Sequence, residues 1–189
     1  MILIRHGQSE FNVVFGATRR DPGIRDPKLT EEGRKQAETL AERLAEHDVA
    51  RLIASPYRRA LETAEILATR LDLAIEVQAV VGERAAFTCD IGSSPAELSE
   101  RWPHLDLAHL PEQWWPDFEE SEPQLHRRCA RFREHMTTQA DWRRVAVVTH
   151  WGFIRGLTGL TLPNAAAIRI DPHRPEVEPE PLHIPAEKR

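Results

Sequence analysis

Two short apolar runs, each followed by a histidine, constrain the fold of this chain most strongly. Met1–Ile4 precedes Arg5 and His6, and Val145–Thr149 precedes His150. Continuous apolar runs of this length are typical of strands buried in a parallel sheet. Open α/β sheets bind their ligands beyond the carboxyl ends of such strands. We therefore expect both histidines and Arg5 to meet at one site that binds an anion, in particular a phosphate.

Strand and helix patterns alternate over the first part of the chain. Apolar residues recur at helical spacing over residues 31–47 and 55–71, and Ser55 followed by proline predicts a capped start for the second helix. Residues 49–54 and 73–77 have the composition of short strands. The alternation predicts an α/β fold with three layers, in which helices cover both faces of a mostly parallel sheet. It does not predict the strand order.

Residues 82–120 interrupt this alternation. They contain four prolines and three of the five tryptophans of the chain, which is unlike a regular strand–helix repeat. We expect this stretch to form a small cap insertion, with a short helix over residues 95–101 and the tryptophan pair at 114 and 115 packed inside it.

Beyond the cap, the sequence predicts a return to regular elements. The expected elements are helices over residues 124–139 and 153–159 and a last strand over 166–170. Together with a polar loop over residues 7–29, they give a single domain that spans residues 1–170. Residues 171–189 are rich in proline and charge, so we expect an extended or disordered tail.

The composition excludes several classes of function. A net charge of -5 gives no overall basic field for nucleic acid, and no apolar stretch is long enough for a membrane helix. Cys89 and Cys129 form neither a disulfide framework nor a metal-binding pattern. We expect a cytoplasmic protein that needs no metal or other cofactor. The sequence does not indicate an oligomeric state.

Four stretches carry more specific motifs. Residues 5–12 read RHGQSEFN, residues 26–33 read DPKLTEEG, residues 55–64 read SPYRRALETA, and residues 147–155 read VVTHWGFIR. In this order they resemble the signatures of the histidine phosphatase family, also called the phosphoglycerate mutase-like family. The resemblance extends over about residues 1–160 and implies the phosphoglycerate mutase-like fold.

The resemblance implies a role for each residue that would meet the phosphoryl group. His6 would attack phosphorus and form a phosphohistidine, with a backbone carbonyl holding its other ring nitrogen. Arg5 and Arg59 would bind the phosphoryl oxygens as planar, permanently charged groups. His150 and Asn12 would donate further hydrogen bonds to the same oxygens.

The general acid is open to two interpretations. The resemblance implies Glu83, which must be protonated, so we expect burial to raise the pKa of its carboxyl group. Asp90 is the second candidate. Arg84 and Trp151 are expected at the rim of the pocket, and Trp151 occupies a position where the family usually has glycine.

These residues predict a metal-independent phosphomonoesterase that acts through a phosphohistidine on a small phosphorylated metabolite. A phosphoglycerate-type mutase is an alternative because it shares the first half-reaction. The chain lacks the longer loop and mid-chain insert of the mutases that it resembles, which favours hydrolysis. A non-catalytic module that binds phosphorylated ligands is the other alternative.

Overall fold

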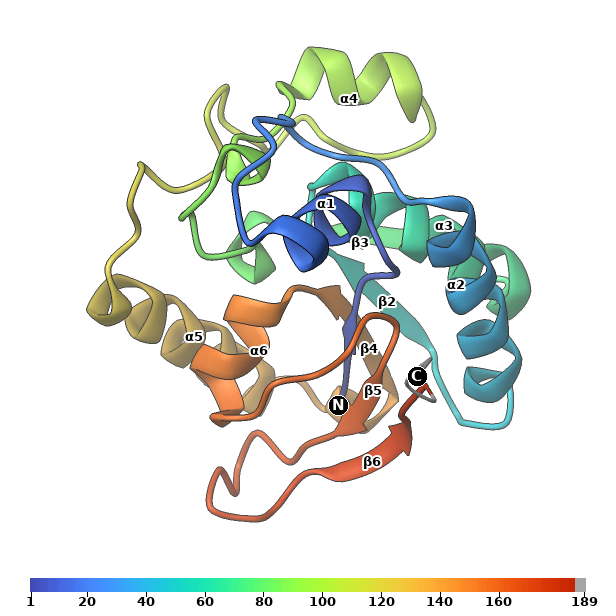
Figure 1. Ribbon diagram of the computed structural model, residues 1–189. Helices are drawn as coiled ribbons and strands as arrows, with labels where there is room; N and C mark the ends of the chain where they lie inside the picture. The colour runs from blue at the N-terminus through green and yellow to red at the C-terminus, as the bar shows by residue number, and fades with distance from the viewer. Residues whose placement is uncertain (186–189) are drawn as a thin grey trace.

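A single mixed sheet forms the centre of the computed structural model, which describes residues 1–185 (Figure 1). The sheet order is β3-β2-β4-β1-β5-β6. Its strands are β1 (Ile2–Arg5), β2 (Arg51–Ala54), β3 (Ile75–Val77), β4 (Val145–Thr149), β5 (Ala167–Arg169) and β6 (Glu180–His183). The pairs β3–β2, β2–β4 and β4–β1 are parallel, whereas β5 and β6 run antiparallel to their neighbours. The prediction of a mostly parallel sheet is confirmed.

Helices cover both faces of this sheet, so the fold has the three layers that the sequence predicts. On one face lie α2 (Glu31–Leu44) and α3 (Arg58–Leu71), and on the other lie α5 (Glu122–Thr137) and α6 (Trp151–Thr158) (Figure 1). Neighbouring residues of β1 point to opposite faces, so Ile2 and Ile4 join one core while Leu3 joins the other. Among the described residues, no helix is both long and apolar enough to cross a membrane.

The central position of β1 and β4 determines where the side chains that follow these strands meet. Ile4 pairs with Val148 and Arg5 with Thr149 in parallel register, so both strands end at the same level. Their apolar residues are almost fully buried. The side chains that follow these two strands, from opposite ends of the sequence, are therefore brought together.

The start of α3 differs from the sequence prediction. The helix begins at Arg58 with Tyr57 as its N-cap, not at Ser55. The Ser55 hydroxyl accepts a hydrogen bond from the Tyr57 backbone N–H and lies 2.7 Å from His150 Nε2. Ser55 is therefore used by a turn and by the histidine, and the predicted cap is wrong. By contrast, the Thr30 side chain caps α2 by accepting a hydrogen bond from Gly33 N.

A helix also replaces part of the predicted polar loop. α1 (Glu10–Thr18) is closed at its start by a capping box between Ser9 and Asn12. Phe11 is the one residue of α1 that is buried, and Val13 and Val14 are exposed. Because so little of the helix packs on the core, its sequence has no clear amphipathic period, and the loop prediction for this stretch is wrong.

The cap insertion contains the predicted short helix, α4 (Pro95–Arg101). It lies at the top of Figure 1, beyond α1 and α3. Trp114 is buried, donates from Nε1 to the Ser93 carbonyl, and packs edge-on against Tyr57 with ring centroids 4.6 Å apart. Trp114 therefore anchors the cap to the domain, whereas Trp115 is half-buried.

The tail carries a strand that the sequence analysis did not predict. β6 pairs antiparallel with β5, and Leu182 packs against the core. Pro181 is tolerated because β6 lies at the edge of the sheet, where one row of backbone groups needs no partner. The domain therefore continues past residue 170. Residues 186–189 of the predicted tail lie outside the described residues.

Candidate active site

His6 is buried at the carboxyl end of β1. Its Nδ1 lies 2.7 Å from the carbonyl of Gly7, so Nδ1 carries the proton and Nε2 keeps the lone pair. Gly7 itself donates to the Thr63 hydroxyl at 3.1 Å. Burial, with the nearby charges of Arg59 and Arg5, lowers the pKa of His6 well below its usual value. The ring is therefore a neutral imidazole near neutral pH, which a nucleophile requires.

His150 follows β4 and lies against His6, with ring centroids 5.1 Å apart. The two histidines meet as the sequence predicts. Nε2 of His150 is held by Ser55, whereas Nδ1 is buried and has no hydrogen-bond partner within residues 1–185. Burial and the charge of Arg59 lower the pKa of His150 well below its usual value, so this ring is also neutral in the free protein.

Two arginines flank the histidines. Arg5 donates from one terminal nitrogen to the Leu162 carbonyl at 2.6 Å, while its buried Nε has no partner in the described part of the chain. Burial and the charge of Arg59 lower the pKa of Arg5 to about 10, so it stays charged at neutral pH. Arg59 is buried and donates to the Cys89 carbonyl at 2.8 Å and to Asp90 at 3.1 Å.

Asn12 is oriented by its oxygen. Oδ1 accepts from the Ser9 backbone at 2.9 Å and from Asn164 Nδ2 at 3.1 Å. The side-chain NH₂ of Asn12 takes no part in these bonds and remains able to donate. Asn164 also donates to the His6 carbonyl at 3.1 Å. Sequence reasoning missed Asn164, because only the antiparallel placement of β5 beside β1 brings it to the site.

Glu83 lies in the same site, held by two backbone donors. Its Oε1 accepts from Arg84 N and from Gly152 N, both at 2.8 Å. Burial, with a smaller effect of the Asp90 charge, raises the pKa of Glu83 to about 7. A Cβ at residue 152 would collide with Oε1, so a larger residue there would displace the Glu83 carboxyl group. Trp151 at the preceding position does not disturb this contact.

Asp90 is bound differently from Glu83. One oxygen pairs with Arg59, and the other accepts from the backbone N–H groups of Ala86 and Phe87, both at 3.0 Å. These contacts suit an ionised carboxylate that anchors Arg59. They favour Glu83 over Asp90 as the proton donor.

The two predicted rim residues also reach the site. Arg84 donates to the Glu120 carbonyl and pairs with Glu122, so its guanidinium is already engaged. Trp151 is 39% exposed and lies near Arg155.

These side chains surround one cavity of about 580 Å³. Its lining includes all predicted site residues except His150, which is fully buried. It also includes three phenylalanines that sequence reasoning did not assign to the site: Phe11, Phe15 and Phe87. No cluster of three or more His, Cys, Asp or Glu side chains within residues 1–185 could hold a metal ion. The arrangement can bind a tetrahedral anion, attack it with an imidazole and supply a proton.

Comparison with known proteins places this arrangement in a family. The model of the histidine phosphatase superfamily (branch 1) matches residues 1–174, so the chain belongs to that superfamily. Phosphoglycerate mutase-like protein 4 of Arabidopsis thaliana is 30% identical over 173 residues, which cover 89% of this chain and 73% of the relative. The glucosyl-3-phosphoglycerate phosphatase of Mycolicibacterium vanbaalenii is 31% identical over 170 residues, which cover 86% and 73%.

A solved structure supports the same assignment. A mycobacterial glucosyl-3-phosphoglycerate phosphatase in complex with VO3 superposes with a TM-score of 0.64 at 26% identity. The match covers 89% of this chain and 88% of that one. The phosphoglycerate mutase-like fold is thereby confirmed.

Proposed function

We propose that this protein is a phosphomonoesterase that transfers the phosphoryl group of a small phosphorylated metabolite to His6 and then to water. The observation that carries this proposal is the meeting of His6 and His150, whose ring centroids lie 5.1 Å apart, beside the buried Arg59 and the buried Nε of Arg5. Membership of the histidine phosphatase superfamily and similarity to a named phosphatase support it.

In the first step, Nε2 of His6 attacks phosphorus in line with the ester oxygen. The P–N bond forms, the P–O bond to the alcohol breaks, and Glu83 gives its proton to the leaving oxygen. Arg5, Arg59 and the NH₂ of Asn12 bind the phosphoryl oxygens. The bound dianion favours the protonated form of His150, so its unpartnered Nδ1 becomes a charged donor.

In the second step, water attacks the phosphohistidine. Glu83, now ionised, takes one proton from the water while the new P–O bond forms. The P–N bond breaks, and its electron pair returns to Nε2 of His6 as phosphate leaves. The protein ends in its starting protonation state, so no metal or redox partner enters the balance.

Turnover of para-nitrophenyl phosphate in the presence of a metal chelator tests this function. We expect hydrolysis that the chelator does not change. Phosphate binding without turnover at any pH would instead favour a non-catalytic module. Activity that is lost with the chelator and restored by metal would exclude the mechanism above.

Phosphorus NMR of the protein with 3-phosphoglycerate separates hydrolysis from the mutase alternative. We expect any loss of the substrate signal to appear as inorganic phosphate. Isomerisation without phosphate release would show that the protein is a mutase. A cytoplasmic location also remains a proposal, and cell fractionation would test it.

A further inference from the structure

Three phenylalanines form an apolar wall in the active-site cavity, here called the phenylalanine wall: Phe11, Phe15 and Phe87. Phe11 and Phe15 lie one turn apart on α1 and stack, with ring centroids 5.1 Å apart. Phe87 comes from the cap insertion and contacts both rings, at 5.4 Å from Phe11 and 5.0 Å from Phe15. The wall therefore joins two segments that are distant in the sequence.

The wall is accessible from the cavity. Phe11 is buried, but Phe15 and Phe87 are only half-buried although each is large and apolar. Both line the same cavity as His6 and Glu83. An alcohol that leaves when the phosphoryl group moves to His6 would therefore lie in the same cavity as its proton donor, Glu83, and the aromatic rings.

Two charged groups near the wall, Arg84 and Asp90, are already paired, and the exposed Arg19 of the cavity lining lies over an aromatic ring. The Arg84 guanidinium is engaged by Glu120 and Glu122, and Asp90 is engaged by Arg59. Arg19 lies near the ring of Phe15, with its central carbon 5.9 Å from the ring centroid. Burying hydroxyl or carboxylate groups against unpaired aromatic carbon is unfavourable, because their hydrogen bonds to water are not replaced.

We propose that the phenylalanine wall selects phosphomonoesters whose alcohol carries an aromatic ring or a compact apolar group close to the ester oxygen. This inference rests on the proposed function, and it narrows the substrate class of the same site. An aromatic ring packs against the wall in stacked or edge-on geometry and leaves no buried polar group unpaired.

Hydrolysis of 2-phenylethyl phosphate and of glycerol 1-phosphate tests the proposal. Both esters release a primary alcohol, so the leaving groups are closely matched and the difference lies in the side group. We expect kcat/KM to be about 10- to 100-fold higher for the phenylethyl ester, which is the usual range for burying an aromatic group. Equal values, or a preference for the glycerol ester, would overturn the proposal and leave the phosphatase function intact.

Variants of the wall connect this preference to its residues. Phe15→Ala and Phe87→Ala should each reduce the preference ratio by about 5- to 20-fold. Phe118→Ala is the matched control, because Phe118 is 68% exposed and does not line the cavity. Phe15→Leu keeps an apolar side chain of similar volume, so this variant should retain most of the preference. Its activity then shows that the loss in Phe15→Ala does not come from misfolding. An unchanged ratio in both alanine variants would contradict the proposal.

Binding of phosphonates keeps the inference testable if neither ester is hydrolysed. The proposed function is then judged by turnover of para-nitrophenyl phosphate alone, and calorimetry with 3-phenylpropylphosphonate and 3,4-dihydroxybutylphosphonate still probes the wall. Tighter binding of the phenyl compound, reduced by Phe15→Ala, supports the apolar preference. Equal affinity for the two phosphonates would overturn it.

Discussion

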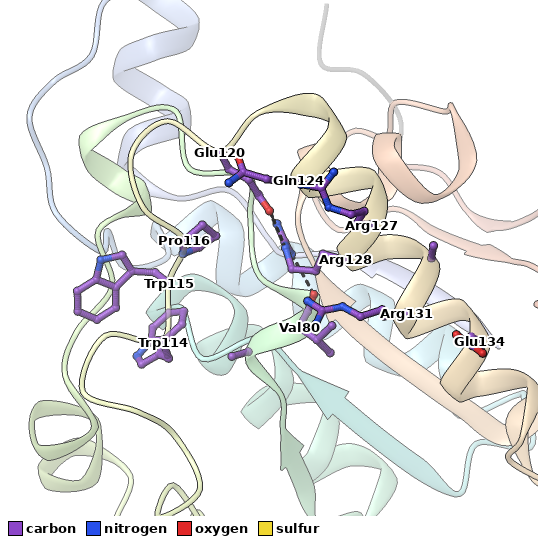
Figure 2. A pocket seen from close by; sticks show the side chains of 12 residues that line it. Val80, Trp114, Trp115, Pro116, Glu120, Gln124, Arg127, Arg128, Arg131 and Glu134 are labelled. Carbon is purple, nitrogen blue, oxygen red and sulfur yellow. Dashed lines mark hydrogen bonds and ion pairs between the residues drawn. The ribbon is translucent and has the colours of Figure 1, made fainter.

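Two of the cavities within residues 1–185 are each lined by several arginines, and they differ in what those arginines face. A groove of about 780 Å³ between α5 and the cap segment is larger than the active-site cavity of about 580 Å³. Figure 2 shows Arg127 and Arg131 of α5 on one side of the groove and Trp114 and Trp115 on the other.

Two arginines of the groove, Arg127 and Arg131, are solvated, whereas the two arginines beside the active-site histidines are enclosed. Arg127 and Arg131 are exposed, while Arg59 is almost fully buried and Arg5 is half-buried with a buried Nε. The active site also contains two histidines whose pKa values are lowered by burial. Converging buried polar groups without full partners therefore mark the reactive site, whereas the size of a cavity does not.

Arg128 lies at the boundary between the two cavities. Its guanidinium pairs with Glu120 at 2.5 Å and donates to the carbonyls of Val80, Gly82 and Glu83 (Figure 2 draws the groove side). The charge of Arg128 therefore faces the backbone that carries the proton donor. Substitutions on each side of this boundary should therefore differ in their effect on activity.

His6→Ala should have the largest effect. Removing the nucleophile leaves binding groups without covalent chemistry, so kcat should fall by about 10⁴-fold or more. His104→Ala is a matched control, because His104 is an exposed histidine of the cap. Steady-state assays with para-nitrophenyl phosphate measure both. Retention of most activity in His6→Ala would contradict the assignment of catalysis to the cavity that contains His6.

Glu83→Gln should have the next largest effect, on the order of 10²- to 10³-fold for esters of poorly leaving alcohols and less for para-nitrophenyl phosphate. Because the pKa of Glu83 is raised to about 7, the free enzyme loses its proton donor as the pH rises through about 7. The wild-type kcat/KM should therefore fall above that pH, and the fall should be absent in the variant. Equal slowing of both esters would direct attention to Asp90.

The same carboxyl group predicts a change in stability with pH. The pKa of this carboxyl group is higher in the folded protein than in the unfolded protein. The folded state therefore loses stability as the pH rises from the pKa of the unfolded state through the pKa of the folded state. Glu83→Gln should therefore unfold at a higher temperature than the wild type above pH 7, with a smaller difference at pH 5. Thermal unfolding at the two pH values measures this, and a variant that gains nothing at the higher pH would refute it.

Arg128→Met should have an intermediate effect on catalysis, about 10-fold in kcat, because displacing the Glu83 backbone misplaces the proton donor. The loss should be larger for poorly leaving alcohols than for para-nitrophenyl phosphate. Arg128→Met alone leaves the buried Glu120 carboxylate unpaired, and the double variant Arg128→Met with Glu120→Gln removes that charge. The double variant therefore separates a loss of stability from a misplaced proton donor. If the double variant were equally slow with both esters, Arg128 would have only a structural role.

Arg127→Ala and Arg131→Ala should have the smallest effect. These exposed side chains do not line the active-site cavity, so kcat/KM should stay within about 2-fold of the wild type. A loss comparable with that of Arg128→Met would show that the groove participates in catalysis.

The sequence predicted the parts of the molecule that depend on local pattern. The buried runs that end at Arg5 and Thr149 have the composition of central strands, and their histidines meet as expected. The three layers follow from the alternation of strands and helices. The pair His6 and Glu83 was found through the family motifs, and the structure brings them into one cavity.

The parts that the sequence did not predict depend on tertiary contacts. α1 has one buried residue, so its period is weak, and β6 is an edge strand of low apolar content. Asn164 reaches His6 only because β5 runs antiparallel beside β1. The phenylalanine wall joins α1 to the cap insertion, and a contact between such distant segments cannot be predicted from a local sequence pattern.

Rapid acid–base trapping of the phosphoenzyme tests the central claim most directly. The protein is mixed with para-nitrophenyl phosphate that carries radioactive phosphorus, and the reaction is quenched in alkali within one turnover. The protein is then digested, and the labelled residue is identified by mass spectrometry. The account predicts a base-stable, acid-labile phosphoryl group on the imidazole of residue 6. Turnover without any such adduct, or an adduct on a different side chain, would contradict it.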